Sequence, residues 1–233
     1  MAHRVRWLGH AACQITTEKG AVILIDPWIS GNPSCPIKKD DIKQADLILI
    51  THDHFDHLGT DVPDLVKSTG ATVIVQPELA DTLRKAGVSS DNIVHYGMGM
   101  NIGAEAEIAG VKVIMVQAFH SCAAGTPAGY IIILDDGKTI YHTGDTGVFD
   151  SMRLFGDIYN IDLALVPIGS VFTMNPLQAA VSLSLIKPKV AIPIHYRTFP
   201  VLTQDAAEFI DLSSKKAPEV KVEAIKPGQE VQI

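Results

Sequence analysis

Apolar residues gather in short runs along the whole chain, and each run is bounded by glycine, proline, aspartate or asparagine. Many of the residues in these runs are β-branched, which is typical of buried β-strands. The pattern predicts strands at residues 4–9, 21–26, 46–50, 71–76, 111–117, 129–134, 138–142, 162–168, 189–194 and 219–225.

Helical patterns lie between some of these strands. The segment 57–70 closes on a glycine, and the segment 77–87 begins with proline and ends with glycine. Both are common boundaries of helices. Two further helices are predicted at 175–188 and 203–215. Since no linker or charge run divides the chain, we expect residues 1–233 to form a single mixed α/β domain.

Composition narrows the function classes. Of the 233 residues, 47% are hydrophobic and 19% are charged, which is typical of a globular protein. No apolar run is long enough to cross a bilayer, and the first ten residues lack an apolar signal segment, so we expect a cytoplasmic protein. The net charge of −7 and the lack of a dense Lys/Arg block disfavour a nucleic-acid partner. The apolar content permits a homo-oligomer.

The segment THDHFDH, residues 51–57, places three histidines and two aspartates directly after a predicted strand. His52 and His54 are two residues apart on an extended turn, so their side chains can point the same way. Asp56 and His57 follow as the chain enters a helix and face differently. Any one of these residues could be an ordinary surface or capping residue, but bringing all of them into a pocket without a metal would cost several kcal/mol per charge.

Three more candidate ligands, His120, Asp145 and His195, also follow predicted strands. Loops beyond strand ends are where α/β proteins assemble sites. Two groups of three ligands and one shared carboxylate would fill two adjacent metal sites. Histidine and carboxylate ligands suit Zn, Mn, Fe or Ni, and the three scattered cysteines argue against a thiolate zinc site. The full set is His52, His54, Asp56, His57, His120, Asp145 and His195.

The segments THDHFDH, AFHS, YHTGDTG and PIHY, in this order, resemble the metallo-β-lactamase superfamily. The segments WLGHAAC, LIDPWISGNP, MNIG, GDTGVF and PIHYRTFP resemble the UPF0173 metal-dependent hydrolase family, which is related to the L-ascorbate-6-phosphate lactonases. The resemblance spans nearly the whole chain. It implies a four-layer αββα sandwich with the site along one edge.

The same resemblance implies a ligand arrangement. One metal would be held by His52, His54 and His120, a second by Asp56, His57 and His195, and Asp145 would bridge them. The chain departs from the family at two positions that bear on the substrate pocket. Ser170 stands where the family usually has aspartate, and Asn175 stands where glycine is common.

Several other residues are candidates for supporting roles. Asp26 is expected to hydrogen-bond a ligand histidine and fix its tautomer, and the alternative is a turn aspartate at the strand end before Pro27. His10 is either a substrate or proton-transfer residue or a loop histidine, and His142 is either a partner of the ligands or a core histidine. Arg197 could clamp a phosphate or carboxylate, and a solvated arginine is the alternative.

These residues favour a metal-dependent hydrolase that cleaves an ester, lactone, amide or phosphoester bond of a small molecule. The nucleophile would be a metal-activated hydroxide at a site for two divalent cations, with Zn the first expectation. The predicted catalytic residues are Asp56, which orients the hydroxide or accepts its proton, and His10 and Arg197, which steady charge on the leaving side. The alternatives are a metal-dependent nuclease or phosphodiesterase and a non-catalytic metal-binding protein.

Overall fold

The computed structural model describes residues 2–233, and within this range the strands form two sheets. The strands of the first sheet are Arg4–Gly9 (β1), Ala12–Thr16 (β2), Val22–Ile25 (β3), Leu47–Leu49 (β4), Thr72–Ile74 (β5) and Glu230–Gln232 (β13). Their order across the sheet is β13-β1-β2-β3-β4-β5.

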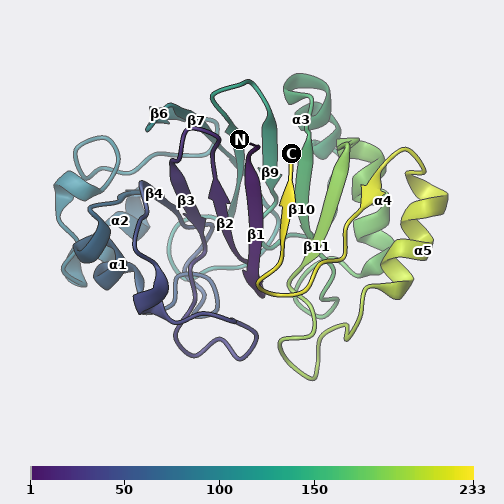
Figure 1. Cartoon of the computed structure of the whole chain (residues 1–233), viewed down its shortest axis with the longest axis horizontal. Coiled ribbons are helices and arrows are strands. Elements are labelled where there is room, and N and C mark those ends of the chain that lie inside the picture. The colour runs from purple at the N-terminus through teal and green to yellow at the C-terminus, as the bar shows by residue number, and fades with distance from the viewer. Residues whose placement is uncertain (1) are drawn as a thin grey trace.

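The second sheet contains the strands Glu105–Ile108 (β6), Val111–Gln117 (β7), Ala128–Ile133 (β8), Thr139–His142 (β9), Leu163–Pro167 (β10), Val190–Ile194 (β11) and Lys221–Val222 (β12). Their order is β12-β11-β10-β9-β8-β7-β6. The two chain ends lie close together at the same side of the molecule (Figure 1), where β13 pairs with β1.

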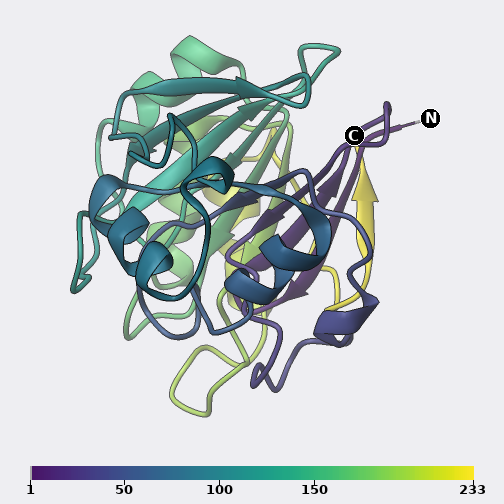
Figure 2. The same cartoon turned by 90° about the vertical axis from the view of Figure 1, so that its left-hand side faces the viewer.

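Helices cover the outer faces of both sheets (Figures 1 and 2). The helices Val62–Thr69 (α1) and Pro77–Lys85 (α2) lie on the first sheet. The helices Met152–Tyr159 (α3), Pro176–Ile186 (α4) and Ala207–Lys216 (α5) lie on the side of the second sheet. Two short 3-10 turns, Lys39–Asp41 (η1) and Ser90–Asn92 (η2), complete the regular structure of the described range. The predicted αββα sandwich is therefore confirmed.

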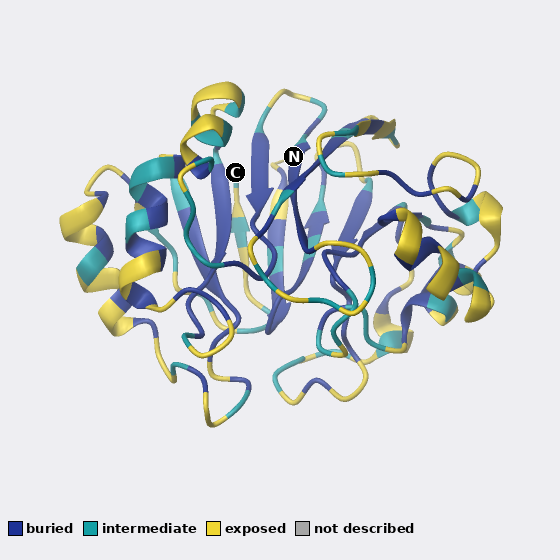
Figure 3. Cartoon of the chain, turned by 180° about the vertical axis from the view of Figure 1, so that it is seen from behind, coloured by how far each residue is buried: buried dark blue, intermediate teal, exposed yellow. Residues whose placement is uncertain are grey.

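The side chains of a strand alternate between its two faces, so the first sheet contributes to two apolar cores. One core lies between the two sheets, and the other lies between the first sheet and its helices. In β4 and the residue after it, Leu47 and Leu49 face the second sheet, whereas Ile48 and Ile50 face α1 and α2. Successive side chains of a strand point to opposite faces, so a strand covered on both sides is apolar throughout. Figure 3 shows the result, with strands buried along most of their length and helices exposed on one face only.

The direction of the strands determines which edge of the sandwich receives the loops that carry the candidate residues. In the first sheet β1, β3 and β4 run the same way, and in the second sheet β7, β9, β10 and β11 do. The carboxyl ends of these strands meet at one edge of the sandwich. Among the described residues, no helix combines the length and apolarity that a bilayer crossing requires.

Four elements were not predicted from the pattern: β2, β6, β13 and α3. The edge strands β6 and β13 are mostly exposed and polar, so they lack the apolar run that reveals a strand. Helix α3 contains Gly156, a weak helix former. A Cβ at this position would lie 2.2 Å from the carbonyl oxygen of Ile186, so the glycine allows α3 to approach the end of α4.

Candidate metal centre

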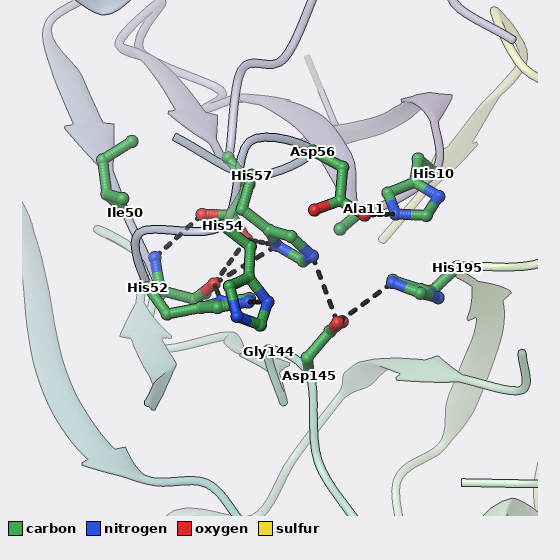
Figure 4. Close-up of polar contacts among 12 residues, drawn as sticks. His10, Ala11, Ile50, His52, His54, Asp56, His57, Gly144, Asp145 and His195 are labelled. Atoms are coloured by element: carbon green, nitrogen blue, oxygen red, sulfur yellow. Dashed lines mark hydrogen bonds and ion pairs between the residues drawn. The ribbon is translucent and has the colours of Figure 1, made fainter. Parts of the chain in front are cut away.

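Strand ends deliver the candidate residues to one edge of the sandwich, where their side chains point toward one another (Figure 4). Strand β4 leads into residues 51–57, β7 into His120, β9 into Asp145 and β11 directly into His195. Strand β1 leads in the same way into His10. The structure thus brings together all seven candidate ligands, in two groups that meet at Asp145.

The first group consists of His52, His54 and His120. His52 Nε2 lies 3.0 Å from His54 Nδ1, and His120 Nε2 lies 3.3 Å from the same atom. One ring nitrogen of each residue lies within 4.8 Å of the others. Three converging imidazoles are a ligand set that divalent cations such as zinc use in catalytic sites.

The second group consists of Asp56, His57 and His195, and His10 joins them. One ligand atom from each of these four residues lies within 4.8 Å of the others. The ring of His10 packs against that of His195, with centroids 3.8 Å apart. Three of the four side chains are fully buried, whereas Asp56 is partly exposed. This group is therefore open to solvent on the side of Asp56, which leaves access for a substrate.

Asp145 lies between the two groups. Its Oδ2 atom is 3.0 Å from His195 Nε2, 3.2 Å from His57 Nε2 and 3.6 Å from His120 Nε2. The other oxygen, Oδ1, is buried and makes no hydrogen bond within residues 2–233. Buried carboxylate oxygens are normally satisfied, so an oxygen without a partner here fits a carboxylate that is shared between two cations.

The protonation states of His52 and Asp145 also fit a metal site. Burial, helped by neighbouring His57, lowers the pKa of His52 to about 2, so its imidazole is neutral. Burial by itself would raise the pKa of Asp145, but His195 and His57 outweigh it and hold the pKa well below its usual range. Neutral imidazoles and ionised carboxylates are the forms in which these side chains bind metals, so His52 and Asp145 carry the protonation states of ligands. The grouping of the nitrogen and oxygen donors fits two adjacent divalent cations.

Asp26, directly after β3, contacts the ring nitrogen of His57 that faces away from Asp145. Its Oδ2 atom lies 2.7 Å from His57 Nδ1, which confirms the predicted hydrogen bond. Asp26 also accepts hydrogen bonds from the backbone N–H and the hydroxyl of Thr51 at 2.8 and 2.6 Å. Burial opposes a charge on His57, but Asp145 and Asp26 raise its pKa well above the usual value. Because Nδ1 faces Asp26, Nε2 of His57 is directed at Asp145.

The variant Asp26→Asn is expected to bind zinc about 10- to 100-fold more weakly, because the amide no longer fixes the ring of His57 as the carboxylate does. It is also expected to lose about 3 kcal/mol of unfolding free energy, since a buried charge pair is broken. Competition with a chromogenic chelator and urea unfolding measure the two effects. Asp46→Asn is the matched control, because Asp46 accepts a backbone N–H of β3 at the opposite end of the sheet. Unchanged zinc affinity in Asp26→Asn would contradict the role of Asp26.

His10 lies inside the site, so it is not a surface loop histidine. It is fully buried, with Nε2 3.0 Å from Asp56 Oδ2 and Nδ1 3.0 Å from Thr198 Oγ1. An ionised carboxylate only accepts hydrogen bonds, so Nε2 carries the proton and Nδ1 accepts from the hydroxyl of Thr198. Burial lowers the pKa of His10 to about 4 despite the opposing effect of Asp56, which agrees with a neutral ring. The sequence pattern did not identify Thr198.

Two further residues that sequence reasoning missed hold the ligand loops in place. The carboxylate of Asp53 accepts the backbone N–H groups of Ala123 and Ala124 at 2.9 and 2.8 Å, which ties the loop of His120 to residues 51–57. The hydroxyl of Thr146 accepts the backbone N–H of Phe119 at 3.0 Å. The only signal for these roles is that Asp53 and Thr146 are next to candidate ligands in the chain.

Among the described residues, neither His142 nor Arg197 forms a hydrogen bond or ion pair with a candidate ligand. His142 is buried, and its ring nitrogens bond the carbonyl of Ala11 at 3.0 Å and the backbone N–H of Gly144 at 3.2 Å, so it is a core histidine. Arg197 is exposed and lines a cavity of about 280 Å³ with Trp7 and other residues, none of which is a candidate ligand. A catalytic role for Arg197 stays a prediction.

The two departures from the family pattern have local explanations. The Ser170 hydroxyl lies 2.9 Å from Thr203 Oγ1, which joins the loop after β10 to the loop after β11. Asn175 caps α4, since its side-chain oxygen accepts the backbone N–H of Gln178 at 2.8 Å. Asparagine is a favoured residue at this position, which gives Asn175 a structural reason independent of any substrate.

Three site residues have a left-handed backbone. The φ angles are 55° at His10, 46° at Asp26 and 55° at His195, each directly after a strand. Residues other than glycine rarely adopt this conformation, and it is concentrated at functional sites. The left-handed residue turns the chain sharply, so its side chain faces the other groups instead of continuing the strand.

Comparisons with known proteins agree with this geometry. Residues 22–196 match the family model described as the beta-lactamase superfamily domain. The chain is 43% identical over 229 residues to a UPF0173 metal-dependent hydrolase of Nitratidesulfovibrio vulgaris, which covers 98% of this chain and 95% of that protein. It is 42% identical over 230 residues to one from Korarchaeum cryptofilum, with 99% of both chains covered. These matches confirm the resemblance seen in the motifs.

Solved structures show the same fold. A metallo hydrolase from the hyperthermophilic archaeon Ignicoccus hospitalis is 35% identical and superposes with a TM-score of 0.89 over 100% of this chain and 99% of that one. The diiron β-hydroxylase CmlA from Streptomyces venezuelae is 14% identical and has a TM-score of 0.79 over 100% of this chain and 54% of that one. The second likeness concerns the fold alone.

Proposed function

Because the chain belongs to the UPF0173 metal-dependent hydrolases of the metallo-β-lactamase superfamily, we propose that it hydrolyses an ester, lactone, amide or phosphoester bond of a small molecule. The observation that carries this proposal is the convergence of five imidazoles and two carboxylates at one edge of the sandwich, with Asp145 between the two groups. Water adds across the bond, so that an ester or lactone gives a carboxylic acid and a hydroxyl group.

The proposal places two divalent cations in the site. His52, His54 and His120 would hold one, Asp56, His57 and His195 the other, and Asp145 would contact both. The ligands are nitrogen and oxygen only, which admits zinc first and manganese, iron or nickel as alternatives. When bound, such cations make a water molecule nucleophilic near neutral pH and polarise the substrate oxygen.

The residues of the chain would position the reaction. Asp56 is the candidate ligand with the most open carboxylate, and it is the group placed to accept a proton or orient the attacking water. His10 directs Asp56, since it donates from Nε2 to the Asp56 carboxylate and is itself held by Thr198. The packing of His10 against His195 keeps the second group together.

The proposal also includes the class of substrate, the cellular location and the oligomeric state. A small-molecule substrate is favoured over a nucleic acid by the net charge of −7. A cytoplasmic location is supported by three free cysteines, which a reducing compartment maintains. A homo-oligomer is compatible with the exposed apolar side chains, and light scattering would detect it.

Metal analysis combined with a substrate panel tests the proposal. The purified protein is expected to contain at least about one zinc, manganese or iron ion per chain and to hydrolyse one or more of bis-p-nitrophenyl phosphate, a p-nitrophenyl ester or a γ-lactone. His57→Ala should abolish turnover, whereas His95→Ala, at an exposed histidine outside the site, should retain it. Fewer than one metal per chain, with no turnover after zinc or manganese is added, would overturn the proposal. Turnover of RNA or DNA alone would favour a nuclease.

A further inference from the structure

Three aromatic side chains form a wall against the second group of candidate ligands. This aromatic wall consists of Trp28, Phe55 and Phe199, whose ring centroids lie 5.7 Å (Trp28 to Phe55), 6.0 Å (Trp28 to Phe199) and 6.3 Å (Phe55 to Phe199) apart. Trp28 and Phe199 also contact the ring of His10, with centroids 5.4 and 5.5 Å away. Since His10 bonds Asp56, the wall adjoins the open side of the site.

Phe55 and part of Phe199 are exposed to solvent, whereas Trp28 is buried behind them. Phe55 lies between His54 and Asp56 in the ligand motif, yet 67% of it is exposed. Other large apolar residues are exposed on neighbouring loops, namely Phe119 after β7, Val171 and Phe172 after β10, and Val201 after β11. Exposed apolar surface that is concentrated around a site marks the place where a ligand loses its contact with water.

Four of the loops that surround the site contain no cationic side chain. The segments 51–61, 118–127, 143–151 and 168–175 contain neither lysine nor arginine. The loop after β11 contains one arginine, Arg197, which lines the separate cavity beside Trp7. The loop between β3 and β4 contains Lys38, Lys39 and Lys43, which line cavities that include no candidate ligand. A carboxylate or phosphate attached to the substrate outside its scissile group would therefore meet apolar surface and lose hydration without gaining a partner.

We propose that the substrate carries an uncharged alkyl or aryl group next to its scissile bond and that Phe55 and Phe199, held by the buried Trp28, bind this group. The inference rests on the proposed hydrolase function and narrows its substrate class. Burial of apolar surface against aromatic rings supplies binding in proportion to the area removed from water. The scissile group itself would lie at the candidate ligands, beyond Phe55.

A matched pair of esters tests the substrate class. One is p-nitrophenyl hexanoate, and the other is the p-nitrophenyl hemiester of adipic acid, which has a chain of the same length that ends in a carboxylate. With zinc-loaded protein, kcat/KM for the hexanoate is expected to exceed that for the hemiester by about tenfold or more. A ratio near one, or one in favour of the hemiester, would overturn the inference while leaving the hydrolase proposal intact.

Variants identify the residues that bind the apolar group. Phe55→Ala is expected to lower kcat/KM for the hexanoate about tenfold while p-nitrophenyl acetate changes by less than about twofold. Because Phe55 lies between two candidate ligands, the metal content of the variant is measured as well. Phe199→Ala, which lies outside the ligand motif, should show the same selective loss. Tyr96→Ala is the control, since Tyr96 is 94% exposed and lies outside the wall.

A binding measurement separates this inference from the hydrolase proposal. Calorimetry with hexanamide and with the monoamide of adipic acid, which resist hydrolysis, should show tighter binding of hexanamide, and Phe55→Ala should remove the difference. If no ester is turned over but hexanamide still binds selectively, the hydrolase proposal fails and the binding role of the wall stands. If both wall variants leave the ester ratio unchanged but alter the mass measured by light scattering, the surface belongs to a subunit interface and the inference is wrong.

Discussion

Asp145→Asn is expected to lower kcat/KM at least about 1,000-fold, which corresponds to about 4 kcal/mol of lost transition-state stabilisation. Asp145 Oδ2 lies within 3.6 Å of nitrogens from His57, His120 and His195, so its carboxylate faces ligand nitrogens of both groups. The amide removes the negative charge and presents either an N–H group or a weaker oxygen ligand to the site. Turnover of the most active ester or diester, together with metal content by mass spectrometry, measures the effect.

The matched control for this variant is Asp150→Asn. Asp150 lies five residues further along the chain, is exposed and pairs only with Arg153 in the described structure. Its substitution removes the same charge from the protein without touching the site, so activity and metal content should stay within about twofold of the parent. If Asp145→Asn retained both the metal and the activity, the shared-carboxylate assignment would be wrong.

Removal of bound metal is expected to lower the Tm by about 10 °C as well as to abolish activity. A cation present at about 1,000 times its Kd contributes about 4 kcal/mol to the folded state, and in a protein of this size each kcal/mol shifts the Tm by about 2–4 °C. The physical reason is that His57, His195 and Asp145 are buried together and leave polar atoms without partners. Differential scanning fluorimetry before and after dialysis against EDTA measures the shift.

Two controls make the metal experiment specific. EDTA that is saturated with zinc before use should leave the Tm unchanged, since its donor atoms are already occupied. Zinc or manganese added back to the stripped protein should restore the Tm and the activity together. Asp145→Asn should show a much smaller shift on EDTA treatment. A parent protein that loses its metal without any change in Tm would mean that the buried groups are held by their hydrogen bonds alone.

The convergence of the ligands could be anticipated from the chain because each one has a local signature. His52, His54, Asp56 and His57 lie within six residues, so covalent linkage keeps them close whatever the fold. His120, Asp145 and His195 each follow an apolar strand, and parallel strands bring their carboxyl ends to one edge. The alternation in β4, with Leu49 and Ile48 on opposite faces, is equally local.

The partners that orient these ligands could not be anticipated in the same way. The contacts of Asp53 with the backbone of Ala123 and Ala124 join segments about 70 residues apart, and aspartate in a loop has many alternative roles. The pairing of His10 with Thr198 spans 188 positions. Helix α3 was not predicted for a related reason. It contains Gly156, a weak helix former whose presence is explained only by the close approach of α3 to α4.

The chain by itself determined most of the strand and helix pattern, the ligand types and the family, because periodicity and short motifs are properties of neighbouring residues. Only the tertiary structure decided that Asp145 lies between the two groups, that His10 bonds Asp56, and that Trp28, Phe55 and Phe199 meet beside them. Those contacts depend on how two sheets stack and on how sharply the chain turns after each strand. Such geometry results from the packing of the whole core, and no local stretch of residues encodes it.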